Sequence, residues 1–81
     1  MLVSLNKNKW IYDWVKDNWE EEFRDIFFSD GAYVARPSNI KRSIAKLLNE
    51  KGYRTKVTSS DNLMIFMKDE EYTFLLIKYS S

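Results

Sequence analysis

Apolar residues in the first third of the chain recur at steps of three and four, the spacing of one face of a helix. They are Trp10, Ile11, Trp14, Val15, Trp19, Phe23, Ile26 and Phe27. On a straight helix, each repeated step of four moves the apolar stripe by about 40° around the axis. A single straight helix could not keep this stripe on one side, so we expect a bend or two short helices.

The string DNWEEEF, residues 17–23, indicates where this break falls. Asn18 is a residue type that caps helix starts, and Glu21 follows three residues later, as in a loose capping box. We therefore expect Asn18 to cap the second helical segment.

A further helix is predicted to begin at Pro37 and to end before Gly52. Proline presets a helical φ in the first turn, and glycine commonly follows the last helical residue. Between these two residues one face is apolar, formed by Ile40, Ile44, Leu47 and Leu48. Before this helix, the string SDG at residues 29–31 indicates a turn, and AYVA at residues 32–35 indicates an edge strand or an extended linker.

Beyond Gly52 the apolar period changes to two, which is typical of strands. Tyr53, Thr55 and Val57 alternate with polar residues, and the string SSDN then indicates a turn. The apolar runs 63–68 and 72–79 follow, joined by the string DEE. We therefore predict a C-terminal three-stranded antiparallel β-meander with residues 63–68 as its middle strand.

Both faces of this middle strand are apolar. In the range 63–68, odd-numbered residues point one way, and even-numbered residues, among them Met64 and Phe66, point the other. If both helices covered the same face, Met64 and Phe66 would stay exposed together with Leu75 and Ile77 of the last predicted strand. A two-fold pair of chains would hide such a patch, so we expect a homodimer.

These elements predict a single small α+β domain over residues 1–81. It consists of a bent N-terminal aromatic helix or two short helices, a basic amphipathic helix and the C-terminal meander. A chain of 81 residues has room for one modest core. The content of 44% hydrophobic and 31% charged residues, with two glycines and one proline, indicates a folded chain.

The chain contains neither cysteine nor histidine. This excludes thiol nucleophiles, disulfides, the commonest general base and the commonest metal ligand. Asp61 followed by Lys78 resembles the metal-binding pattern of restriction-endonuclease-like nucleases, but the triplet ending at Lys78 lacks the second carboxylate. We therefore expect no enzymatic activity, no cofactor and no metal site. Without a long apolar run, we also expect no membrane contact and a cytoplasmic location.

Opposite charges are segregated along the chain, although the net charge is only +1. Residues 13–30 contain seven acidic and two basic residues, whereas residues 36–56 contain seven basic residues and Glu50 as their one acidic residue. If the basic helix and the following strand lie side by side, their cations form one patch for phosphates or for an acidic partner. The candidate contacts are Arg36, Lys41, Arg42, Lys46, Arg54 and Lys56.

Arg36 also belongs to a string that resembles the phosphotyrosine-binding string of Src-homology domains, with Gly31, Tyr33, Val34 and Ser38 at the matching positions. In that family the arginine is followed by a polar turn and another strand, whereas helical spacing follows it here. Arg36 is therefore interpreted as the start of a helix.

Aromatic residues make up 16% of the chain, and most are expected to fill the core. Tryptophan and tyrosine are also enriched in protein interfaces. The candidate protein-interface residues are Trp10, Trp14, Trp19, Glu20, Glu21, Met64 and Phe66.

These observations favour a small non-enzymatic protein-binding module. We expect it to regulate or inhibit a larger protein complex, such as one that processes nucleic acid, as proteins of compact mobile genomes do. The alternative is a nucleic-acid-binding protein. In that case the basic helix of residues 36–51 and the following hairpin would act in a manner that resembles winged-helix readers.

Overall fold

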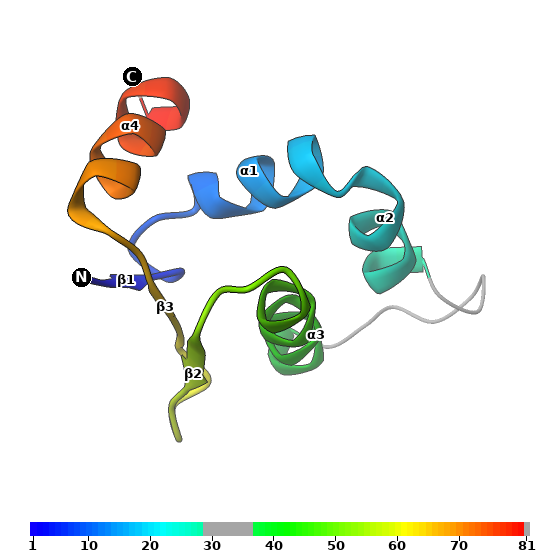
Figure 1. Cartoon of the computed structure of the whole chain (residues 1–81). Helices are drawn as coiled ribbons and strands as arrows, with labels where there is room; N and C mark the ends of the chain where they lie inside the picture. Colours follow the sequence, from blue (N-terminus) through cyan, green and yellow to red (C-terminus); the bar gives the residue numbers. More distant parts are fainter. Residues whose placement is uncertain (29–36, 81) are drawn as a thin grey trace.

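The computed structural model describes residues 1–28 and 37–80. The elements follow one another as β1 (Leu2–Ser4), α1 (Trp10–Asn18), α2 (Glu20–Phe28), α3 (Pro37–Glu50), β2 (Thr55–Val57), β3 (Leu63–Phe66) and α4 (Asp69–Ser80) (Figure 1). The three strands form one antiparallel sheet in the order β1-β3-β2.

The break that the apolar spacing predicts in the N-terminal helical region lies at Trp19, between α1 and α2. The backbone of Trp19 has φ −139° and ψ 61°, outside the helical range. Its amide donates to the carbonyl of Val15 at 2.8 Å, and its carbonyl accepts from the amide of Phe23 at 2.9 Å. The prediction that Asn18 caps the second helix is wrong, because the amide nitrogen of its side chain donates to the carbonyl of Trp14 in α1 at 2.8 Å. Asn18 therefore serves the C-terminal end of α1, where backbone carbonyls lack helical partners.

The basic amphipathic helix is present as α3, with the predicted start and end. Gly52 follows its C-terminal end with φ +97°, a conformation that side chains with a Cβ rarely adopt. The amide of Gly52 donates to the carbonyl of Asn49, and the amide of Tyr53 donates to the carbonyl of Leu48. This pair of bonds is a Schellman motif, which satisfies the last carbonyls of the helix. The predicted turn at 29–31 and strand or linker at 32–35 lie outside the described residues.

The predicted C-terminal meander is wrong, because residues 69–80 form helix α4. The run 72–79 is apolar at most positions, so it has no alternation that would separate a strand from a helix. The preceding Asp69, Glu70 and Glu71 occupy the first turn of α4, where negative charge interacts favourably with the helix dipole. They therefore begin a helix and do not form the tip of a hairpin.

The third strand of the sheet comes from the N-terminus. β3 is the middle strand, as predicted for residues 63–68, but its second neighbour is β1, with Val3 opposite Ile65. The amino group of Met1 donates to the carbonyl of Met67, whose amide donates to the carbonyl of Met1 at 2.9 Å. β1 has three residues, too few to produce a periodic signal in the sequence.

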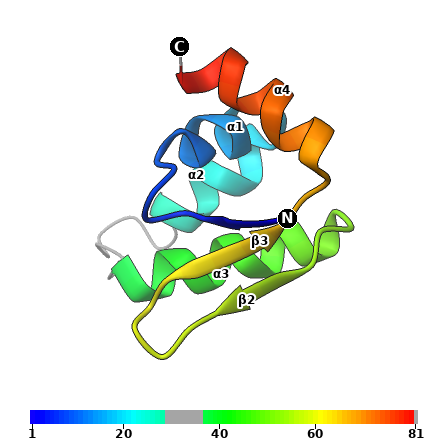
Figure 2. The ribbon, with the colours of Figure 1, turned by 90° about the vertical axis from the view of Figure 1, so that its left-hand side faces the viewer.

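The helices cover one face of the sheet, and the core lies between them. Leu63 and Ile65 are fully buried on this inner face, and α3 packs behind β2 and β3 (Figure 2). α1 contributes Trp10, Ile11, Trp14 and Val15 to the same buried cluster. α4 packs against α1. The longest described helix, α3, has 14 residues, and none of the described helices has the length and apolar character to cross a bilayer.

Candidate functional site: an open sheet face

The face of the sheet that points away from the core is the candidate site. Val3, Ile65 and Thr55 face the helices. Side chains alternate along a strand, so the residues next to them in the sequence point to the opposite side. We define the open face as Leu2, Ser4, Arg54, Lys56, Met64 and Phe66. In the part of the chain that the structure describes, no helix lies across it (Figure 2).

Two large apolar side chains lie next to each other on the open face. Leu2 of β1 is opposite Phe66 of β3, and their exposed fractions are 45% and 44%. In the neighbouring row, Ser4 is opposite Met64, and the Ser4 hydroxyl donates to Oδ1 of Asn62 at 2.9 Å. The open face therefore has an apolar centre beside a satisfied polar position.

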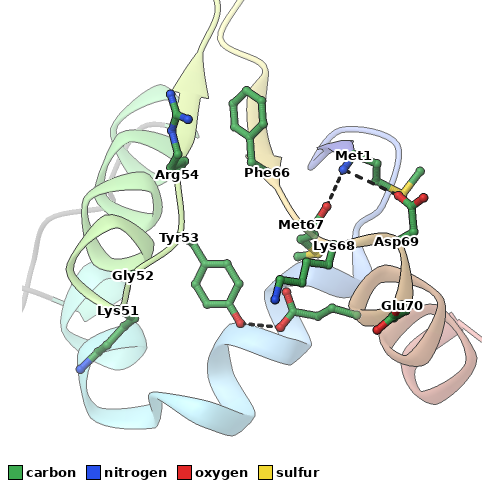
Figure 3. Close-up of a pocket in the computed structure, with 11 residues that line it drawn as sticks. Met1, Lys51, Gly52, Tyr53, Arg54, Phe66, Met67, Lys68, Asp69 and Glu70 are labelled. Atoms are coloured by element: carbon green, nitrogen blue, oxygen red, sulfur yellow. Dashed lines mark hydrogen bonds and ion pairs between the residues drawn. The ribbon is translucent and has the colours of Figure 1, made fainter.

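Arg54 and Phe66 form a cation–π pair at the centre of this face. The guanidinium carbon of Arg54 lies 5.5 Å from the centroid of the Phe66 ring (Figure 3). The two residues are also joined through the backbone, because the amide of Phe66 donates to the carbonyl of Arg54 at 2.9 Å. Cation–π pairs at exposed sites contribute about 0.5–1 kcal/mol, enough to orient both side chains.

A groove of about 870 Å³ continues from this pair toward the start of α4 (Figure 3). Residues 51–54 line one side of the groove, and Met1 with residues 67–71 lines the other. The groove thus lies between the end of α3 and the beginning of α4.

A hydrogen bond joins the two sides of the groove. The hydroxyl of Tyr53 donates to Oε2 of Glu71 at 2.9 Å. Burial, this hydrogen bond and the negative charge of Glu71 raise the pKa of Tyr53 to about 12. The ring of Tyr53 also packs edge-on against Trp14, with centroids 5.3 Å apart. Tyr53 therefore stays protonated at neutral pH and connects the groove to the core.

Acidic and basic groups around the groove differ in their interactions. Asp69 lies 3.8 Å from the amino group of Met1, and Glu71 accepts the bond from Tyr53. Within residues 1–28 and 37–80, by contrast, no carboxylate forms an ion pair with the basic residues of this region, Lys51, Arg54, Lys56 and Lys68. The open face therefore carries two cations, Arg54 and Lys56, that pair with no carboxylate in this part of the chain, whereas the groove is lined by both cations and carboxylates.

The predicted basic patch is divided between two surfaces. Arg42 and Lys46 are exposed on α3, whereas Arg54 and Lys56 lie on the open face. The two pairs are separated because the intervening side chains of β2 face α3, and the hydroxyl of Thr55 donates to Oδ1 of Asn49 at 2.9 Å. Lys41 is half-buried on α3, and Arg36 lies outside the described residues.

Lys46, an exposed cation of α3, lies close to acidic residues of α2. Lys46 shares a shallow depression with Glu22 and Asp25. Within α2, Arg24 and Glu20 form an ion pair at 2.9 Å. Among the described residues, α2 forms no ion pair with α3. The segregation of charge along the sequence thus brings opposite charges close together where α2 meets α3.

The tryptophan candidates lie mostly in the core. Trp10 and Trp14 are only 8% and 5% exposed, and Trp19 is half-buried. Trp10 stacks on Tyr79 of α4, with ring centroids 6.2 Å apart. The burial of Trp10 and Trp14 leaves little of either ring for a partner to reach.

The other predicted interface residues lie at the surface. Glu20 and Glu21 are exposed on α2, while Met64 and Phe66 belong to the open face. Sequence reasoning did not find Leu2, which completes the apolar row with Phe66. An apolar residue at a chain terminus gives no periodic signal, so only the strand pairing reveals its position.

Within the described ranges, no group of three acidic side chains is placed to hold a metal ion. Comparison of the chain with protein-family models, curated proteins and solved structures gives no match.

Proposed function

We propose that this protein is a protein-binding module and that the open face of its sheet is the docking surface. The observation that carries the proposal is the neighbouring pair Leu2 and Phe66, whose side chains are 45% and 44% exposed. They lie on a sheet face that no helix among the described residues covers (Figure 2). Exposed apolar side chains that lie together mark interaction sites in small proteins. The cations Arg54 and Lys56 beside them supply the polar rim that protein interfaces have around an apolar centre.

We also propose that this protein has a non-enzymatic role, as a regulator or inhibitor of a larger complex. The open face offers apolar and cationic contacts, which suit binding of another protein surface. We also propose the cytoplasm as its compartment, and fractionation of cells that express the tagged chain would check this.

Affinity capture with matched variants tests the docking surface. Phe66→Ser removes the aromatic side chain of the open face, and Phe74→Ser removes another exposed phenylalanine, which lies on α4 and is 64% exposed. We expect the wild type and Phe74→Ser to capture the same protein from the native host, and Phe66→Ser to lose it.

Leu2→Ser serves as a second variant of the open face, since it changes an edge strand and leaves the middle strand intact. Circular dichroism and thermal unfolding establish that each variant is folded. Capture of the same proteins by all folded variants would contradict the proposal.

A further inference from the structure

We infer that the open face binds an acidic segment of another protein, one that carries apolar side chains beside its carboxylates. This inference rests on the proposed function and specifies the chemistry of the partner. The side chains of the open face form rows that run across the strands. Lys56 is opposite Met64, and Arg54 lies over Phe66. Each row thus places a cation, either Lys56 of β2 or Arg54 just before β2, beside an apolar side chain of β3.

The row of Arg54 and Phe66 continues across the sheet to Leu2. A bound segment would therefore meet positive charge over β2 and apolar side chains over β3 and β1. Arg54 immediately precedes β2 and lies two residues before Lys56, and residues two apart in extended backbone project on the same side about 7 Å from each other. A segment with carboxylates on the side over β2 and apolar side chains on the side over β3 and β1 matches this arrangement.

The charges around the face favour a negatively charged occupant. Among the described residues, Arg54 and Lys56 have no carboxylate in ion-pair contact, while Asp69 and Glu71 already have polar partners. Figure 3 shows the exposed Glu70 on the side of the groove opposite Arg54. Carboxylates of a partner would thus meet cations over β2, and the acidic start of α4 lies across the groove.

The same observations favour a protein over a nucleic acid. Of the six residues that define the open face, Phe66 alone is aromatic, and the guanidinium of Arg54 lies over its ring. Single strands bind through successive aromatic stacking positions along a basic groove. Duplexes require many cations against their phosphates, whereas the open face has two. The apolar side chain of Leu2 would contribute to neither mode.

Photo-crosslinking from position 66 tests the inference in the native host. Phe66 is replaced by p-benzoylphenylalanine, and the same replacement of Phe74 is the control for a different exposed surface. We expect position 66 to crosslink to a protein segment that contains apolar residues and in which Asp and Glu outnumber Lys and Arg. A crosslink from position 66 to a basic or neutral segment would overturn the inference and leave the proposed function intact.

Two other crosslinking outcomes also overturn the inference. A crosslink from position 66 to nucleic acid or to a second copy of this chain identifies a different occupant. Absence of any crosslink from position 66, or the same crosslinked protein from positions 66 and 74, contradicts both the inference and the proposed docking surface.

A titration with the crosslinked segment as a labelled synthetic peptide measures the role of charge. The double variant Arg54→Glu/Lys56→Glu reverses both cations of the open face, and Arg42→Glu/Lys46→Glu reverses two exposed cations of α3. Both double variants change the net charge by the same amount. We expect Arg54→Glu/Lys56→Glu to lower the affinity for the peptide about tenfold or more, as measured by fluorescence anisotropy. Arg42→Glu/Lys46→Glu should lower this affinity by less than about twofold. Equal effects of the two double variants would overturn the inference, because only the total charge would then matter.

Discussion

Trp14 of α1 lies at the centre of an aromatic cluster with Trp19, which follows α1, and Tyr53, which follows α3. Its ring packs edge-on against Trp19 and Tyr53, with centroids 5.6 and 5.3 Å apart, and it is 5% exposed. We expect Trp14→Ala to lower the free energy of unfolding by about 3–5 kcal/mol, because it leaves a cavity in the core. Urea unfolding measures this change. The control Phe74→Ala, at a residue 64% exposed, should stay within about 0.5 kcal/mol of the wild type.

Tyr53 makes the stability of the protein dependent on alkaline pH. Burial, the hydrogen bond to Glu71 and the charge of Glu71 raise its pKa from 10.0 to about 12, so folding favours the protonated hydroxyl. The stability that this preference provides is complete below pH 10 and is lost as the pH rises through about 12. We therefore expect Tyr53→Phe to lose less unfolding free energy than the wild type across this interval, as measured by urea unfolding at a series of pH values.

Two variants provide controls for the tyrosine titration. Burial also raises the pKa of Tyr12, and burial with a hydrogen bond to Asp17 raises the pKa of Tyr79, so part of the alkaline loss remains in Tyr53→Phe. Glu71→Gln removes a negative charge beside Tyr53 and should lower its pKa while burial still raises it. A tyrosinate absorbance titration that is the same in Glu71→Gln as in the wild type would contradict this account, and Tyr53→Phe identifies the part of the signal that belongs to Tyr53.

Helix α4 buries one side of a segment that is apolar almost all around. Leu75 is 6% exposed and packs in the core, whereas Ile77 is 67% exposed. We expect Leu75→Ala to cost about 2–5 kcal/mol of unfolding free energy and Ile77→Ala to stay within about 0.5 kcal/mol of the wild type. In a strand, residues two apart share a face, so equal effects of the two substitutions in urea unfolding would contradict the helix.

The whole molecule presents less continuous apolar surface than a C-terminal meander would. The expected homodimer depended on Leu75 and Ile77 lying on the sheet beside Met64 and Phe66, but the structure places both on α4. We therefore expect sedimentation at micromolar concentrations to give a mass near 9.7 kDa. A mass that rises with concentration would contradict this expectation.

The sequence by itself determined the elements whose signals are local. Pro37, Gly52 and the apolar face between them predicted α3, because caps and periodicity act within one element. Steps of three and four predicted the N-terminal helices and their break, and alternation predicted β2. The same alternation placed Met64 and Phe66 on one face of the middle strand, so this part of the candidate site was predictable.

The tertiary structure alone decided the partners of these elements. Residues 72–79 are apolar on most sides, so their period could not distinguish helix from strand, and the contacts of α4 with α1 decided it. The edge beside β3 was then filled by β1, a pairing between residues more than 60 positions apart, such as Val3 and Ile65. The division of the cations between α3 and the open face depends on α3 packing against the inner side of the sheet. Sequence periodicity indicates which side of an element is buried, but it contains no information about which other element covers that side.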